Sequence, residues 1–202
     1  MANLGKGSYG LVKLVQHRGS KDLYALKTID KNKISEEASI EVLKREISIH
    51  MNMKHENIIR LYDFVEEEEK VHLILEFAQG GSMFHEIRRR RRLTEEVARD
   101  FFTQTCKGIK YLHDQSIIHR DIKPENILIA GRDVIKICDF GWCVEGGDIR
   151  LTFCGTLDYM APEMIMGGGH SYKLDVWALG VLIYEMVHGY APFRANKESD
   201  KC

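Results

Sequence analysis

The stretch His-Arg-Asp-Ile-Lys-Pro-Glu-Asn, residues 119–126, decides the fold of this chain. It matches the pattern H-R-D-x-x-x-x-N at each fixed position, and Asp-Phe-Gly follows at residues 139–141. Ala-Pro-Glu at residues 161–163 closes the loop that begins there. Each triplet is common by chance, but their order and spacing are not. Further motifs upstream extend the same pattern.

A glycine-rich segment lies near the start of the sequence. Residues 5–12, Gly-Lys-Gly-Ser-Tyr-Gly-Leu-Val, fit the pattern G-x-G-x-x-G-x-V. A dinucleotide-binding loop shares these glycines but opens a helix, whereas residues 11–15 continue in the pattern of a strand. Glycines between two strands let backbone amides lie close to phosphates, because no Cβ stands in the way. The segment therefore predicts a phosphate-binding loop between strands.

A lysine and a glutamate downstream of this loop form a candidate ion pair. Lys27 ends the strand-like run Tyr-Ala-Leu-Lys, and Glu46 lies beside the apolar helical stripe of Leu43 and Ile47. A glutamate next to that stripe can face a sheet instead of water. We expect Glu46 to pair with Lys27 and to aim its ammonium group at phosphates.

The apolar spacing predicts a strand-rich first part. Residues 4–30 alternate as hairpin-connected strands with a turn at 19–22, and a helix follows from Ser35 as its N-cap. Residues 58–64 and 71–75 are predicted strands, separated by four glutamates at 66–69 that we interpret as a solvated loop.

The second part is predicted to be mainly helical. Helices are expected at 83–92, at 94–113 with Thr94 as cap, and at 175–188, the last buried and ended by Gly189. Short β segments are expected around 117–118, 127–129 and 134–137, and a long loop over 139–171. The arginine run at 88–92 is interpreted as an exposed helix end.

Taken together, these motifs resemble the eukaryotic protein kinase family over essentially the whole chain. The resemblance implies an α+β, bilobal fold, in which residues 1–202 form one kinase domain. A small antiparallel β-sheet lobe with one key helix and the hinge would occupy 1–78, and a mainly helical lobe 79–202. It also implies a serine/threonine kinase that uses ATP and Mg²⁺.

The resemblance assigns catalytic roles to individual residues. Asp121 would accept or orient the proton of the substrate hydroxyl, Lys123 would neutralise charge on the γ-phosphate, and Asn126 and Asp139 would bind Mg²⁺. Residues that would bind the nucleotide are Leu4, Gly5, Lys6, Gly7, Ser8, Tyr9, Gly10, Val12, Ala25, Lys27, Glu76, Phe77, Ala78, Glu125, Asn126, Leu128 and Asp139. Taken singly, each apolar member of this set is as well explained as plain core.

Details beyond the shared motifs resemble the Aurora kinases. Lys123 together with Cys-Gly-Thr at 154–156 is typical of serine/threonine kinases, and Trp142 directly after Asp-Phe-Gly is unusual. The Aurora resemblance extends over residues 154–159, 162–165 and 192–196. Cyclic-nucleotide-dependent kinases are the alternative, because residues 177–186 resemble that family too.

The resemblance also implies regulation and substrate choice. Thr152 matches an activation-loop phosphorylation site, and Arg45, Arg120 and Arg150 match the arginines that bind its phosphate. Glu125 and Glu185 match acidic positions that bind an arginine two residues before the target, and Thr156 is assigned to the substrate site. The expected partner is therefore a protein with Ser or Thr near Arg or Lys, together with an activating protein on the first lobe. Ser82 departs from relatives that carry an acid there to bind a more distant arginine.

Composition excludes several other classes of protein. Lys plus Arg number 29 against 30 Asp plus Glu, so bulk attraction to nucleic acid or to an anionic membrane is not expected. Five scattered cysteines, with no visible signal peptide, predict an intracellular protein of the cytoplasm or nucleus; a spindle, centrosome or centromere location is implied by resemblance alone.

Family members continue beyond the position of Cys202, so the alternative to an active kinase is a truncated pseudokinase or scaffold that binds nucleotide.

Overall fold

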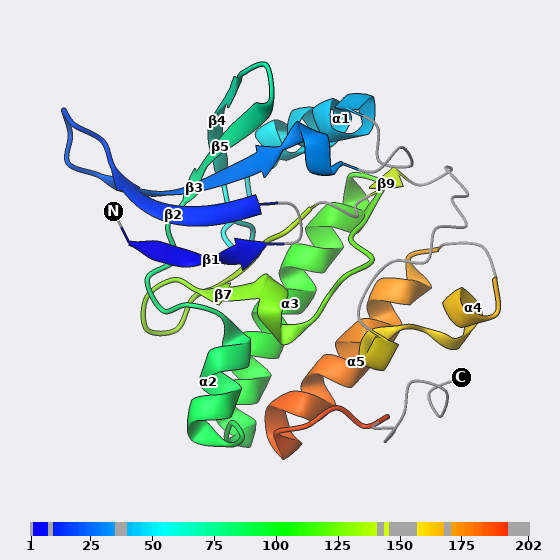
Figure 1. Cartoon of the computed structure of the whole chain (residues 1–202). Helices are drawn as coiled ribbons and strands as arrows, with labels where there is room; N and C mark the ends of the chain where they lie inside the picture. Colours follow the sequence, from blue (N-terminus) through cyan, green and yellow to red (C-terminus); the bar gives the residue numbers. More distant parts are fainter. Residues whose placement is uncertain are drawn as a thin grey trace. The chain divides into compact units, whose positions relative to one another are not determined.

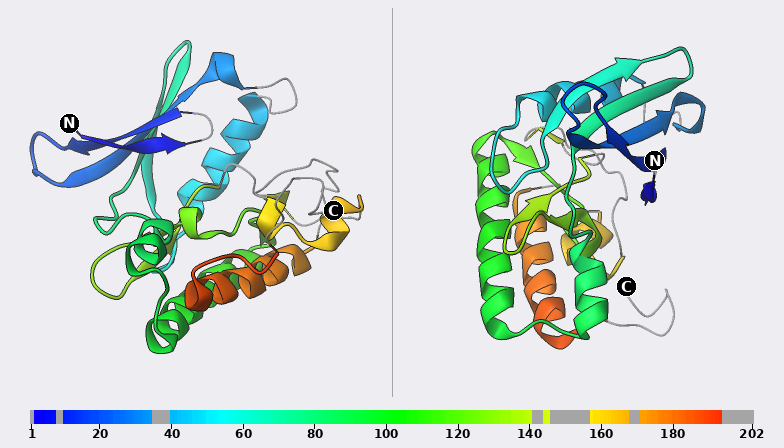
Figure 2. Two further views of the ribbon diagram at one scale, coloured as in Figure 1. Left: turned by 60° about the horizontal axis from the view of Figure 1, so that its bottom comes forward. Right: turned by 90° about the vertical axis from the view of Figure 1, so that its left-hand side faces the viewer.

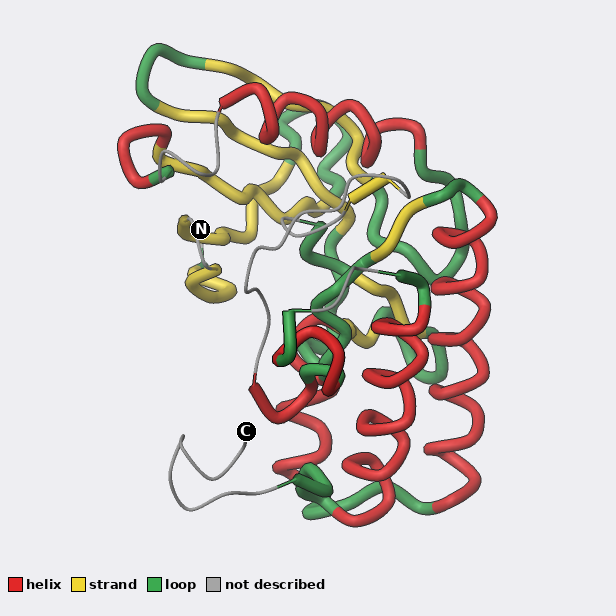
Figure 3. Tube along the Cα trace, turned by 90° about the vertical axis from the view of Figure 1, so that its right-hand side faces the viewer, coloured by secondary structure: helices red, strands yellow, loops and turns green. Residues whose placement is uncertain are grey.

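The computed structural model describes residues 2–7, 10–34, 40–140, 144–145, 157–167 and 171–193. The chain divides into two units, Met1–Ala78 and Gln79–Cys202 (Figure 1). Strand dominates the first unit and helix the second (Figure 3). The family expectation of an α+β fold with an antiparallel sheet is confirmed.

The first unit is built on a five-stranded antiparallel sheet in the order β1-β2-β3-β5-β4. Its strands are β1 (Asn3–Gly7), β2 (Gly10–Gln16), β3 (Leu23–Asp30), β4 (Leu61–Glu66) and β5 (Lys70–Glu76). The predicted turn at 19–22 joins β2 to β3, and a short 3-10 helix, η1 (Lys31–Lys33), follows β3. The alternation in residues 4–30 therefore predicted β1, β2 and β3 correctly.

Helix α1 (Ile40–Asn52) packs on the sheet and closes the core of this unit. Ile47 of the helix is buried with Ile29, Leu61, Val71 and Leu73 of the strands. Removing these side chains from water stabilises the unit by roughly 1.5–3 kcal/mol for each one. The predicted cap, Ser35, lies outside the described residues.

Two expectations for the first unit need correction. Strand β4 begins at Leu61, and residues 58–60 precede it with a single β-bridge at Ile58. Ile58 and Ile59 are each only 2% exposed, so their apolar character reflects burial. The predicted loop is one residue shorter than expected: residues 66–69 are all exposed, but Glu66 still belongs to β4. Glu66 ends β4 and lies 2.8 Å from Lys31 Nζ and 3.3 Å from Lys44 Nζ, and these cations lower its pKa.

The second unit contains α2 (Met83–Arg90), α3 (Glu95–Asp114) and α5 (Lys173–His188), with α5 alongside α3 (Figure 2). Small elements lie between them: β6 (Ile117–Ile118), η2 (Pro124–Asn126), β7 (Ile127–Ile129), β8 (Ile135–Ile137), β9 (Val144–Glu145), η3 (Leu157–Tyr159) and α4 (Pro162–Ile165). Strand β7 pairs with β8, and β6 with β9. In the described part of the chain, no helix is both long enough and apolar enough to cross a membrane.

Helix boundaries in this unit follow the expected capping chemistry with two differences. Thr94 caps α3 by accepting the Val97 N–H, and Gly189 ends α5 with a left-handed φ of 84°, both as predicted. Helix α2, however, ends at Arg90, because Arg91 turns to a φ of 69°. The predicted loop at 139–171 is also interrupted by β9, η3 and α4.

Candidate functional site

The carboxylate of Asp121 is the centre of the candidate site in the second unit. It is only 5% exposed, and Lys123 Nζ lies 2.8 Å from its Oδ2 and 3.0 Å from its Oδ1. The Asn126 side-chain amide donates to Oδ2 and to the Asp121 backbone carbonyl, each at 2.8 Å. A buried carboxylate requires such partners, because desolvating an unpaired charge costs several kcal/mol. The three predicted residues are thus brought together.

A second buried acid positions the backbone of this loop. Asp175, fully buried in α5, accepts the His119 N–H at 3.0 Å and the Arg120 N–H at 2.8 Å through its two oxygens. His113 of α3 also donates to Asp175, at 2.8 Å. Arg120 has a φ of 67°, a conformation that most residues adopt only when their surroundings enforce it. Asp175 therefore holds the turn that presents Asp121.

Backbone contacts link Asn126 to Asp139. The Cys138 N–H donates to the Asn126 carbonyl at 2.9 Å, which brings the residue before Asp139 next to Asn126. His119 contacts the Cys138 carbonyl at 3.2 Å through Nε2, and Asp139 itself has a φ of 63°. Two oxygen-bearing side chains predicted to bind Mg²⁺ are thus on adjoining backbone.

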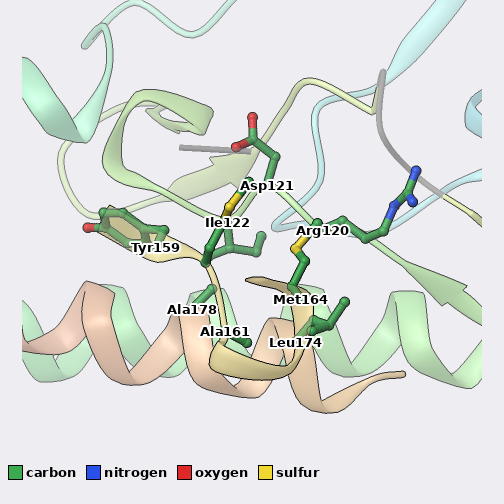
Figure 4. Close-up of a pocket in the computed structure, with 9 residues that line it drawn as sticks. Arg120, Asp121, Ile122, Tyr159, Ala161, Met164, Leu174 and Ala178 are labelled. Atoms are coloured by element: carbon green, nitrogen blue, oxygen red, sulfur yellow. The ribbon is translucent and has the colours of Figure 1, made fainter. Parts of the chain in front are cut away.

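Below the loop lies a small pocket formed with α4 and α5 (Figure 4). Its lining residues are Arg120, Asp121, Ile122, Tyr159, Met160, Ala161, Met164, Leu174 and Ala178. In Figure 4, the Asp121 carboxylate points away from Ala161, Ala178 and Leu174, and the Arg120 side chain diverges from it. The apolar packing supports the loop from one side and leaves its carboxylate directed to the other.

The acids assigned to substrate recognition lie close to this loop. Burial raises the pKa of Glu125, and the negative charges of Glu185 and Asp121 raise it further, whereas Lys123 lowers it. Glu185 is 9% exposed and accepts a 2.6 Å hydrogen bond from the Tyr159 hydroxyl. Burial and this bond raise the pKa of Tyr159, so the hydroxyl stays a donor. Glu185 of α5 thus already has one partner, Tyr159 of η3.

In the first unit, β2 and β3 bring several predicted residues onto one face. Val12 lies directly opposite Lys27, and Ala25 shares the face of Lys27 because it is two residues away along β3. Ile29, on the same face, packs under α1, the helix that carries Glu46. Lys27 is therefore on the face that α1 covers, and the Lys27–Glu46 ion pair stays a prediction.

The remaining nucleotide residues of the first unit lie near its strand ends. Leu4 is 43% exposed, Phe77 is half-buried, Ala78 is buried, and Glu76 accepts the Arg60 N–H at 3.2 Å. An added Cβ at Gly5 would meet nothing within 4 Å, which leaves room for a phosphate above the backbone. At Gly10 it would lie 1.6 Å from the Thr28 carbonyl oxygen, so that glycine is needed for packing on β3.

Some predicted residues cannot be placed. Outside the described residues lie Ser8, Tyr9, Arg150, Thr152 and Thr156, as well as Gly141 and Trp142. The backbone of Lys6 and Gly7 is described as the end of β1. Leu128 is half-buried on β7, Arg45 is exposed on α1, and Arg120 is half-buried.

Three residues that organise the site, His113, Tyr159 and Asp175, were not predicted from the sequence. Asp175 had one visible signal, a carboxylate within a stretch that is otherwise apolar nearly all round. Such an acid must find partners when its helix is buried. His113 and Tyr159 had no comparable signal, because their partners lie 62 and 26 positions away.

Comparison with known proteins agrees with this geometry. The chain matches the protein kinase domain family over residues 1–202. It is 44% identical over 191 residues to an Aurora kinase of Schizosaccharomyces pombe, covering 94% of this chain and 54% of that protein. It is 40% identical to Aurora kinase B of Danio rerio (98% and 62% covered) and 38% identical to serine/threonine-protein kinase Aurora-2 of Arabidopsis thaliana (98% and 70%).

The match covers only part of each relative. The chain spans little more than half the length of the first of these relatives and 70% of the last. The match nevertheless extends over the glycine-rich segment, the loop around Asp121 and helix α5 alike. The chain therefore belongs to the protein kinase family, and within that family it resembles the Aurora kinases.

Proposed function

We propose that this chain transfers the γ-phosphoryl group of ATP to Ser or Thr hydroxyls of proteins in a basic sequence context. The observation that carries the proposal is the buried Asp121 carboxylate, held by Lys123 and Asn126. These groups match the arrangement that phosphoryl transfer needs, which is positioning and charge stabilisation more than covalent chemistry.

In this proposal, Asp121 orients the substrate hydroxyl and accepts its proton. The hydroxyl oxygen forms the new bond to the γ-phosphorus, while the bond to the β-phosphate oxygen breaks and ADP leaves. Lys123, already an ion-pair partner of Asp121, offsets charge on the transferred group. Asp175 and His119 keep the loop in place during the reaction.

The donor set near Asp121 fits a magnesium ion. Because the Asn126 amide nitrogen donates to Asp121, its amide oxygen is the atom left to bind a cation. Together with the Asp139 carboxylate it offers the hard oxygen ligands that Mg²⁺ prefers. When bound, Mg²⁺ would neutralise the phosphate oxygens. In the second unit, the residues assigned to ATP are Glu125, Asn126, Leu128 and Asp139. In the first unit they are Leu4, Gly5, Lys6, Gly7, Ser8, Tyr9, Gly10, Val12, Ala25, Lys27, Glu76, Phe77 and Ala78.

Replacing Asp121 by Asn tests this function directly. The measurement is Mg²⁺-dependent transfer of labelled phosphate to a basic Ser/Thr peptide. Asn keeps the shape but cannot accept a proton, so we expect the rate to fall by about 10²–10⁴-fold. ATP binding should persist, because Asp121 is assigned to the substrate hydroxyl. If the wild-type chain binds ATP but transfers no phosphate, it is a nucleotide-binding scaffold instead.

Regulation and cellular role follow from the Aurora resemblance alone. We propose that phosphate on Thr152 activates the chain by binding three arginines, Arg45, Arg120 and Arg150. We also propose that an activating protein binds the first unit. The substrates are proposed to act in mitosis, at the spindle, centrosome or centromere. A Thr152→Val variant should lose the activation that an upstream kinase gives the wild type. Full activity of that variant under the same conditions would remove the claim.

A further inference from the structure

The arginine run at 88–92 is the strongest charge feature that the kinase function leaves unexplained. All five residues are exposed, at the end of α2 and in the turn that follows it. Basic residues in a last helical turn complement the helix dipole. That explanation covers 88–90 alone, because α2 ends at Arg90 and the last two arginines lie beyond it.

Only part of this charge is neutralised within the protein. Glu86 binds Arg89 with two hydrogen bonds of 2.7 and 2.8 Å and Arg90 with one of 2.5 Å, and these arginines lower its pKa. Arg88 lies over the Phe84 ring, 5.1 Å from its centre. Among the residues that the structure describes, no carboxylate pairs with Arg88, Arg91 or Arg92. Among the described residues, Glu86 thus pairs with two of the five arginines.

The run is held in a defined shape. Ile87 and Leu93, which flank it, are only 2% and 3% exposed, and the Leu93 N–H donates to the Met186 carbonyl of α5 at 2.8 Å. The turn after α2 and the end of α5 lie at the same end of the unit (Figure 2, right). A preorganised charge cluster loses less conformational entropy on binding than a mobile one.

The backbone at Arg91 shows that this shape carries a cost. Its φ of 69° with a ψ of −37° lies in a sparsely populated region, which costs a residue other than glycine roughly 1–3 kcal/mol. The turn packs tightly on Gly189, where an added Cβ would lie 2.0 Å from the Arg91 carbonyl oxygen. An arginine thus occupies a position where glycine would be less strained.

We propose that the run at 88–92 is a docking site for an acidic, carboxylate-rich segment of a partner protein. Guanidinium groups bind carboxylates in a bidentate manner, as Arg89 already binds Glu86. A nucleic acid fits less well, because the positive charge is confined to one turn and the exposed Glu95 and Glu96 follow it. A short acidic segment needs no basic surface beyond the run. The site is independent of phosphoryl transfer.

The test measures binding of a short fluorescein-labelled polyglutamate peptide to the full chain by fluorescence anisotropy. Reversing three charges, as R88E/R91E/R92E, should weaken binding by about tenfold or more. The matched control K107E/R132E/K173E makes the same charge change at exposed positions of the same unit and should stay within about twofold of wild type. Equal loss in the two variants would reduce the effect to net charge and overturn the site.

Two further variants separate binding from folding. R91G removes one charge and relieves the backbone strain of the positive φ, so it should bind the peptide more weakly while its melting temperature is unchanged or higher. E86Q releases Arg89 and Arg90 and should tighten binding by about two- to threefold. Phosphorylation of a basic peptide should be unchanged in R91G, which distinguishes this site from the kinase proposal. A single-stranded oligonucleotide that competes better than polyglutamate would overturn the choice of partner.

Discussion

Glu125 and Glu185 form a pair of acids whose environments differ. Glu125 belongs to the segment that also supplies Asp121 and Lys123, whereas Glu185 lies on α5 and accepts the Tyr159 hydroxyl. Their charges interact, since Glu185 raises the pKa of Glu125. An arginine of a bound substrate would relieve this repulsion between carboxylates. This relief would give the proposed preference for a basic substrate an electrostatic basis.

Replacing Glu125 by Gln tests that basis. For a peptide with arginine two residues before the target, we expect KM to rise by about tenfold, the loss of one charge-assisted hydrogen bond. The ionised carboxylate binds the arginine, so wild-type KM should rise as the pH falls through the pKa of Glu125. Because that pKa is raised, the rise begins at a higher pH than for an ordinary glutamate.

The pH profile supplies the control for this prediction. In Glu125→Gln, KM for the same peptide should lose the pH dependence that Glu125 confers. A peptide with alanine in place of the arginine should give the two proteins the same KM. If the variant and the wild type respond equally to the arginine, Glu125 does not contribute to its recognition.

Contacts between site residues follow from local geometry only where the residues are neighbours along the chain. Asp121, Lys123 and Asn126 lie within one short motif, so their proximity follows from local geometry. Asp175 contacts His119 from 56 positions away, and no local pattern connects the two. Tertiary packing of α5 creates this contact, which explains why the supporting acid was missed.

Asp175 of α5 contacts the loop around Asp121 directly, and one histidine, His113, links α3 to Asp175. His113 of α3 donates to Asp175, whose oxygens also accept the His119 and Arg120 N–H groups. His113→Ala removes one of these three donors. We expect a loss of about 1–2 kcal/mol in the free energy of unfolding, measured by denaturant titration. The turnover number should fall more than KM changes, because the loop that presents Asp121 is loosened.

A conservative variant separates positioning from general destabilisation. His113→Gln keeps a donor that can reach a carboxylate and should recover part of the turnover number. His85→Ala is the matched control, since His85 is exposed on α2 and bonds only to Ser82 nearby. If all three variants lose stability and turnover in proportion, His113 serves packing alone.

Element boundaries were predicted best where a local signal ends the element. The Thr94 side chain caps the start of α3, and Gly189 ends α5 with a hydrogen bond from its own N–H. Both signals can be read from the residue type alone. The end of α2 had no such signal, because good helix formers continue through residue 92. Packing of the turn on Gly189 and the Leu93–Met186 bond end the helix instead. Tertiary contacts thus override propensity there.

Across the whole molecule, residues assigned to the nucleotide are distributed over both units. Lys27, Val12 and Ala25 share a face of the sheet in the first unit, and Asn126 and Asp139 lie on adjoining backbone in the second. The proposed binding of ATP would stabilise the folded chain, because a ligand that binds only the native state shifts the folding equilibrium toward it.

Thermal unfolding with ATP and Mg²⁺ measures this stabilisation. At about 100 times the dissociation constant, a ligand adds about 2.7 kcal/mol of stability, which for a chain of this size raises the melting temperature by about 5–10 °C. In Asp139→Asn the Mg²⁺-dependent part of the shift should disappear, whereas Asp121→Asn should retain it. Asp133→Asn, at an exposed position, is the matched control. A shift that survives intact in Asp139→Asn would exclude Asp139 as the metal ligand.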